Sequence, residues 1–177
     1  MERYIAFLRG INVSGQKIIK MESLRKAFIE EGFTDVKTYI QSGNVIFNSD
    51  EADAQKLIQR IEDMIGNHFG FRTDVILRSH IDIESVLNSL QISRLESGED
   101  GKYYITFLKE EYNEPLIVPL FSKNKDVEVI YQNKKDFISV SNLFKGSYGF
   151  PNAFIEKFTG IPATTRNPDT LKKILEL

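Results

Sequence analysis

The sequence predicts an α+β protein with two ferredoxin-like halves, each an antiparallel sheet with helices packed on one face. Two observations predict this fold class. Residues 1–80 contain candidate strands and helices in the order βαββαβ, which is the ferredoxin-like pattern. The stretch Tyr4–Arg9 (Y-I-A-F-L-R) then recurs almost residue for residue as Tyr104–Lys109 (Y-I-T-F-L-K). Because a helical or mixed segment and a hairpin follow each copy, we expect the second half to repeat the first.

The elements of the first half follow from hydrophobic periodicity, with short apolar runs as strands and a 3.6-residue period in the helices. The expected strands are Tyr4–Gly10, Val36–Gln41, Val45–Asn48 and Asp74–Arg78. The first helix is expected at Met21–Glu31 and ends before Gly32. The second carries an apolar stripe from Leu57 to Phe69, with Asp50 as the expected N-cap.

A further helix is expected next, with one apolar face formed by Ile83, Val86, Leu87 and Leu90. The polar run Glu96–Lys102 follows, and its two glycines are typical of a linker. We therefore predict a first half at residues 1–80, a helix and linker at 81–102, and a second half at 103–177. In the second half we expect strands at Tyr103–Leu108, Val127–Tyr131 and Phe137–Val140, a partly helical Asn113–Asn124, and helices at Pro151–Phe158 and Pro168–Leu175.

Composition limits the functional classes. The chain has 177 residues, 41% of them hydrophobic, and no apolar run as long as a membrane helix requires. It has no cysteine, which excludes disulfides, thiolate zinc sites and cysteine nucleophiles. It begins directly in a candidate strand, so we expect no signal peptide, no membrane contact and a cytoplasmic location. The net charge of −2 disfavours a general nucleic-acid binder, although a local basic patch stays open.

Motifs for catalysis or cofactor binding are missing. The sequence has no G-x-S-x-G, no Walker loop and no G-x-G-x-x-G. Neither His68 nor His80 has another ligand at metal spacing, and the carboxylates lie at expected helix ends or polar faces. We therefore expect no metal and no cofactor, and no catalytic residue can be named.

Three polar stretches remain as candidate binding residues. Arg9 and Asn12 flank Gly10 at the end of the first strand and suit contacts with anions or amides, although a simple strand end would also explain them. In Gln41-Ser42-Gly43-Asn44, a tight hairpin explains Gly43 and Asn44 but explains Gln41 and Ser42 less well.

The third stretch is Thr164-Thr165-Arg166-Asn167-Pro168. Asn167 is a good N-cap and Pro168 suits the first position of a helix. Thr165 and Arg166 would add a hydroxyl and a guanidinium beside the free N–H groups of a helix N-terminus, which favours an anion site. Capping alone stays an alternative.

These stretches resemble the bacterial family known as domain of unknown function 1697. Members of that family contain F-L-R-G-I-N-V-G-G, a K-M-x-x-L helix, G-F-x-x-V-x-T-Y-I-Q-S-G-N-V-x-F and a final T-x-R-N-W-x-T-V. The matching residues here are Phe7–Val13, Lys20, Met21, Leu24, Gly32, Phe33, Val36, Thr38–Val45, Phe47, Thr164, Arg166, Asn167 and Thr170. Ser14, Gln16-Lys17, Tyr148-Gly149 and Pro168 depart from the pattern. The resemblance implies two ferredoxin-like halves but no activity.

We predict a binding or regulatory module for a small anionic, phosphate-bearing ligand. The predicted ligand-binding residues are Arg9, Asn12, Gln41, Ser42, Asn44, Thr165 and Arg166, converging on one cleft. An enzyme using Ser42 on a phosphorylated substrate stays an alternative, as does a self-associating structural protein or homodimer.

A nucleic-acid module is a further alternative. It would require a basic face formed by Arg9, Lys17, Lys20, Arg25, Lys37 and Arg166. Recognition of RNA by strand aromatics is disfavoured, because the expected strand Asn44–Phe47 lacks the required pattern and Tyr4 and Phe7 point to opposite faces.

Overall fold

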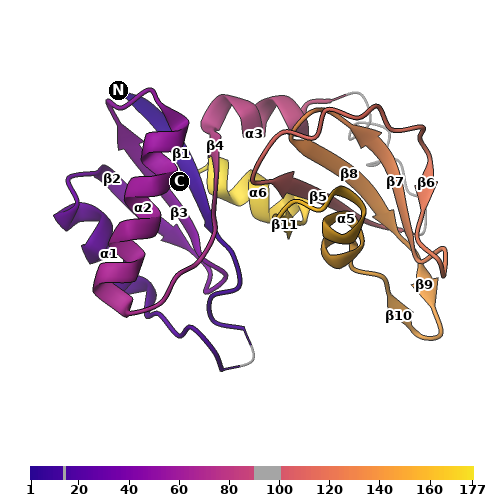
Figure 1. Ribbon diagram of the computed structural model, residues 1–177, viewed down its shortest axis with the longest axis horizontal. Helices are drawn as coiled ribbons and strands as arrows, with labels where there is room; N and C mark the ends of the chain where they lie inside the picture. The colour runs from indigo at the N-terminus through magenta and orange to yellow at the C-terminus, as the bar shows by residue number, and fades with distance from the viewer. Residues whose placement is uncertain (14, 90–100) are drawn as a thin grey trace. The chain divides into compact units, whose positions relative to one another are not determined.

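The computed structural model describes residues 1–13, 15–89 and 101–177, which fall into two compact units (Figure 1). The first unit comprises Met1–Ile83 with Ile174–Leu177, and the second comprises Glu84–Lys173. Residues 96–100 of the expected linker, and Leu90, lie outside the described residues. The α+β class with antiparallel sheets is confirmed.

The first unit has one four-stranded sheet in the order β2-β3-β1-β4, and every neighbouring pair is antiparallel. Its elements are β1 (Glu2–Leu8), α1 (Met21–Glu30), β2 (Thr34–Tyr39), β3 (Asn44–Ser49), α2 (Ala54–Phe69) and β4 (Val75–Ser79), followed by α3 (His80–Leu87). The observed order of elements up to β4 is the βαββαβ order read from the sequence.

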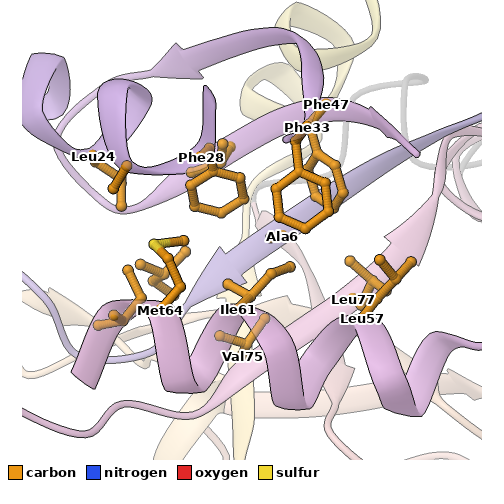
Figure 2. Close-up of a cluster of buried hydrophobic side chains, with 14 of the residues drawn as sticks. Ala6, Leu24, Phe28, Phe33, Phe47, Leu57, Ile61, Met64, Val75 and Leu77 are labelled. Atoms are coloured by element: carbon orange, nitrogen blue, oxygen red, sulfur yellow. The ribbon is translucent and has the colours of Figure 1, made fainter. Parts of the chain in front are cut away.

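The core of the first unit lies between the sheet and the helices α1 and α2 (Figure 2). Side chains alternate along β1, so Tyr4, Ala6 and Leu8 share the face that meets the helices. Phe47 of β3 lies at the centre of this core, and its ring centroid is 4.6 Å from that of Phe33. Each fully buried side chain of this size stabilises the fold by roughly 1.5–3 kcal/mol, so this core dominates the stability of the unit.

The predicted N-cap of α2 was wrong. Asp53, not Asp50, begins this helix, because its Oδ1 accepts hydrogen bonds from the backbone N–H groups of Gln55 at 3.0 Å and Lys56 at 3.3 Å. The Asp50 carboxylate instead pairs with the N-terminal amine of Met1 at 3.2 Å. The cap therefore lies three residues beyond its predicted position.

This correction gives a testable expectation for stability. Replacing Asp53 with Ala removes both cap hydrogen bonds, and we expect a loss of about 1 kcal/mol in the free energy of unfolding. Asp50→Ala removes only an exposed ion pair, which contributes roughly 0–1 kcal/mol. Urea unfolding of both variants checks the assignment, and a larger loss for Asp50→Ala would contradict it.

The second unit has a five-stranded antiparallel sheet in the order β11-β5-β8-β7-β6 and a separate two-stranded hairpin. Its elements are β5 (Lys102–Leu108), β6 (Leu120–Phe121), β7 (Val127–Gln132), β8 (Asp136–Ser141), β9 (Leu143–Phe144), β10 (Ser147–Tyr148), α5 (Pro151–Thr159), β11 (Ala163–Arg166) and α6 (Pro168–Leu175). Ile155 of α5 packs on Leu108, Val129 and Phe137 of the sheet.

The second half differs from the prediction in three places, one of which is the hairpin of β9 and β10, which the sequence reading missed. The prediction of a partly helical Asn113–Asn124 was wrong, because this segment contains β6 and no helix. Pro115 and Pro119 donate no backbone hydrogen bond, and the Leu116 N–H binds the Gln132 side chain at 3.0 Å rather than a helical carbonyl. The sequence reading also missed β11.

No helix in the described ranges has both the length and the hydropathy of a membrane span.

Candidate functional site

The loop after β1 is held in place by Asn12. Its backbone has a positive φ of 55°, and its side-chain amide joins two segments. Nδ2 donates to the carbonyl oxygens of Ile19 at 3.0 Å and Gln41 at 2.9 Å, while Oδ1 accepts from the Ile19 N–H at 2.8 Å. Asn12 therefore fastens both ends of its own loop to the turn between β2 and β3.

That turn is stabilised in the same way by Asn44. This side chain is fully buried, and its Nδ2 donates to the Tyr39 carbonyl at 2.9 Å and the Ser42 hydroxyl at 3.0 Å. Gly43 has a positive φ of 77° and lies against Ile11 and Leu8. The side chain of Gln41 is exposed. Asn44, Gly43 and the Ser42 oxygen therefore have structural roles in the turn.

Arg9 lines a surface pocket of about 360 Å³ on the first unit. Every side chain that lines the pocket is polar. The residues are Arg9, Lys17, Gln59, Glu62, Asp63, Arg72, Thr73 and Asp74. They come from the loop after β1, from α2, and from the connection between α2 and β4. The pocket can hold a charged ligand and is unsuited to an apolar one.

The carboxylates of the pocket already bind groups of the protein. Glu62 Oε1 accepts from the Val75 N–H at 2.9 Å, and Asp63 Oδ1 accepts from Gln59 Nε2 at 3.0 Å. Asp74 Oδ2 lies 3.8 Å from Arg9 Nη1. Neutral donors therefore occupy part of the hydrogen-bonding capacity of Glu62 and Asp63, and Arg9 balances the charge of Asp74.

The cations are engaged differently. Lys17 Nζ donates to the carbonyl oxygen of Arg72 at 2.8 Å and lies 5.8 Å from the centroid of the Phe71 ring. The exposed guanidinium of Arg72 makes no hydrogen bond or ion pair with any other described residue. Arg72 can therefore bind a ligand without breaking a contact within these residues.

Thr165 and Arg166 lie in the second unit, in β11. The Thr165 hydroxyl is buried, lies 2.8 Å from the Thr106 hydroxyl and donates to Asn152 Oδ1 at 3.0 Å. Arg166 Nη1 donates to Thr164 Oγ1 at 2.7 Å and the Thr165 carbonyl at 2.8 Å. Burial lowers the pKa of Arg166 to about 10, so it stays positively charged at neutral pH.

Asn167 has the capping role expected from the sequence. Its Oδ1 accepts from the Thr170 N–H at 2.7 Å at the start of α6. The predicted site residues are thus divided, with Arg9, Asn12, Gln41, Ser42 and Asn44 in one unit and Thr165 and Arg166 in the other. Their convergence on one cleft stays a prediction.

A family described as protein of unknown function, DUF1697, matches residues 1–137. The chain belongs to this family. The solved structure of a conserved bacterial protein from Streptococcus pneumoniae is also similar to this DUF1697 chain, with 25% sequence identity and a TM-score of 0.71. The similarity covers 99% of this chain and 97% of that one. A comparison with curated proteins gives no match.

The residues matched by the DUF1697 family include Arg9, the Asn12 loop and the Gln41–Asn44 turn, whereas Thr165 and Arg166 lie beyond residue 137. Sequence reasoning missed Lys17 and Arg72 as pocket residues. They lie on loops separated by more than fifty positions, and no local spacing relates them. Arg72 lies two positions before the expected strand Asp74–Arg78, which is only a weak sequence signal.

Two further features of this DUF1697 protein concern metal ligation and the aromatic side chain Tyr4 of β1. Residues 1–13, 15–89 and 101–177 contain no group of three or more His, Asp or Glu side chains that could hold a metal ion. Tyr4 is buried and stacks on Phe47 at 5.9 Å within the core. Burial, helped by Glu2, raises the pKa of Tyr4 to about 12.

Proposed function

We propose that this DUF1697 protein is a binding module for a small, phosphate-bearing anion, with its site in the pocket that Arg9 lines. The observation that carries the proposal is the set of three cations, Arg9, Lys17 and Arg72, in a pocket whose lining side chains are all polar and also include three carboxylates. Guanidinium groups bind phosphate oxygens through parallel hydrogen bonds, and an ammonium adds a compact positive charge. Because the carboxylates of the pocket bind protein donors, the exposed Arg72 is the natural first contact for an anion.

In this proposal Asn12 and Asn44, which belong to the stretches shared with the family, support the site and do not line it. Asn12 holds the loop after β1 against the turn between β2 and β3, and Asn44 holds that turn together. The same loop carries Lys17, so its position depends on this support. Gln41 and Ser42 belong to the same turn. Thr165 and Arg166 form a second polar group in the other unit and are not among the residues that line this pocket.

We infer that both units are ferredoxin-like, because β7-β8-β5-β11 in the second unit repeats the order β2-β3-β1-β4 of the first. The segment containing β6 replaces the first helix in the second unit. The bacterial, cytoplasmic setting predicted from the sequence is part of the same proposal.

Calorimetric titration with inorganic phosphate, ribose 5-phosphate and ATP tests this function. We expect at least one of them to bind, and Arg72→Gln to weaken that binding by roughly 10-fold to 100-fold, as for the removal of a hydrogen bond to a charged group. Arg25→Gln is the matched control, because Arg25 is exposed on α1 and does not line the pocket.

Two results would count against the proposal. The first is no heat from any of the three anions at millimolar concentration. The second is equal weakening by Arg72→Gln and Arg25→Gln, which would reveal a general charge effect and no defined site. Arg9→Gln gives an independent check on the pocket, since Arg9 and Arg72 reach it from different loops.

A further inference from the structure

The second unit carries an exposed group of aromatic and lysine side chains that the proposed pocket does not involve. We name it the aromatic–lysine surface and define it by Phe144, Tyr148, Phe150, Lys102, Lys125 and Lys145. Phe144, Lys145 and Tyr148 lie on the hairpin formed by β9 and β10, which is separate from the five-stranded sheet (Figure 1), and the other three residues lie on adjoining segments. It is therefore a candidate interaction surface of the second unit alone.

The rings of this surface are unusually exposed. The exposed fractions of Phe144, Tyr148 and Phe150 are 37%, 40% and 57%. Tyr148 and Phe150 are two residues apart in extended chain, so their side chains project to the same side about 7 Å apart. Phe150 is held in place by an edge contact with Tyr104 at 5.5 Å. The hairpin pairs Leu143 with Tyr148 and Phe144 with Ser147, so Tyr148 shares one face of the hairpin with the exposed Leu143, and Phe144 lies on the opposite face. Exposed apolar side chains gathered on one small element are typical of an interaction site.

Each face of the hairpin has a lysine beside a ring. Lys102 Nζ lies 4.3 Å from the centroid of the Tyr148 ring, and Lys145 Nζ lies 5.4 Å from that of Phe144. The stretch from residue 142 to residue 150 (N-L-F-K-G-S-Y-G-F) contains no acidic residue. The hairpin therefore combines aromatic rings with positive charge.

A neighbouring turn adds a further cation. The Asn142 N–H donates to the Asp126 carbonyl at 2.9 Å, and a Cβ built on Gly149 would lie 2.6 Å from the same oxygen. Both ends of the hairpin thus meet the turn that carries Lys125, between β6 and β7. The Asp126 carboxylate accepts from the Ser122 hydroxyl at 2.6 Å.

We propose that the aromatic–lysine surface binds single-stranded nucleic acid. Exposed rings stack on bases without regard to sequence, and lysines beside them neutralise the phosphates. The chain as a whole has a net charge of −2, so the proposal rests on this local patch and not on the overall charge. It is independent of the function proposed for the pocket.

Two other occupants fit the surface less well. A bilayer would require the apolar side chains at the tip, but the exposed Leu143 lies at the base of the hairpin and the tip is Lys145-Gly146-Ser147. A second copy in a two-fold symmetric dimer would bring the same lysines together, and the hairpin offers no acidic residue to balance them. Charge complementarity therefore favours a polyanion with aromatic bases.

The test is fluorescence anisotropy of the full chain with labelled dT12 and rU12 at several salt concentrations. We expect binding that weakens with salt, and a roughly 10-fold or larger loss of affinity for Tyr148→Ala and for Phe150→Ala. The double variant Lys102→Gln/Lys145→Gln should reduce the slope of log affinity against log salt by about 0.7 for each phosphate that it no longer neutralises. Phe158→Ala and Lys157→Gln are matched controls on α5.

Several outcomes would overturn the proposal. No binding of either strand at low salt would do so, as would equal losses for the surface variants and their α5 controls once thermal unfolding shows all of them to be folded. Tighter binding of a duplex than of dT12 would exclude base stacking. Binding to phosphatidylserine vesicles but not to dT12, or a dimer abolished by Phe150→Ala, would reassign the surface to a membrane or to a second copy.

Discussion

Asn44→Asp is expected to destabilise the first unit by about 3–5 kcal/mol at neutral pH, as for an uncompensated buried charge. The side chain is fully buried, and its Nδ2 donates to the Tyr39 carbonyl and the Ser42 hydroxyl. An ionised carboxylate has the same shape but no donor. The Tyr39 carbonyl oxygen would then face a negative charge in the interior, which removes its hydrogen bond and adds repulsion, while the Ser42 hydroxyl can turn to donate to the carboxylate.

The loss should depend on pH with a definite sign. Burial and neighbouring acceptors raise the pKa of the introduced carboxyl in the folded state above its unfolded value of about 3.9. The protonated carboxyl can donate one hydrogen bond, so the variant is most stable at low pH relative to the wild type. That stability is lost as the pH rises through the raised folded-state pKa.

Urea unfolding at pH 4 and pH 7 measures this effect. Hydrogen exchange of peptides from β1 and β3 assigns the loss to the first unit. Asn48→Asp is the control, because Asn48 lies in the same strand but is only half-buried, and we expect its loss to stay below about 1 kcal/mol. Equal losses for the two variants, or no change with pH, would show that Asn44 does not anchor the turn.

The first half could be predicted well because its periodicity is strong. The apolar run of β1 and the apolar stripe of α2 both point to one core, and that core is observed. The N-cap could not be chosen from local sequence. Asp50 and Asp53 lie three positions apart and have the same chemistry, so only the backbone direction entering α2 distinguishes them.

The missed strand β11 shows a different limit. Its residues include Thr164, Thr165 and Arg166, which give no apolar alternation. The strand exists because it pairs with β5, where the Thr165 hydroxyl meets the Thr106 hydroxyl 59 positions earlier in the chain. Two buried polar groups that satisfy each other have no hydrophobic signal, so this pairing was beyond a local reading.

The candidate site was only partly predictable for a related reason. The residues of the three polar stretches were recognised as candidates. Sequence alone, however, cannot distinguish a side chain that binds backbone from one that binds a ligand. Asn12 and Asn44 direct their amides at carbonyl oxygens of neighbouring segments. The cations Lys17 and Arg72 reach the pocket of Arg9 from segments that only the fold brings together.

Gly43→Ala should destabilise the protein by about 2–4 kcal/mol, because left-handed backbone strain and overpacking both contribute. Gly43 has a φ of +77°, and a Cβ there would lie 2.8 Å from Ile11 Cδ1 and 3.0 Å from Leu8 Cβ. Gly10 is the matched control: its φ is +69°, but a Cβ there would meet nothing within 4 Å. Gly10→Ala should therefore show the backbone strain alone, about 1–2 kcal/mol.

The difference between these two variants measures how tightly the turn packs on the loop after β1. Ile11→Val removes the atom nearest to the added methyl group. Alone it should cost about 0.5–1.5 kcal/mol, whereas in the Gly43→Ala background it should cost less or restore stability. A double-mutant cycle by urea unfolding gives this coupling. Additive effects would mean that Ile11 does not confine the turn. Glycine would then be required at position 43 only for the left-handed backbone conformation.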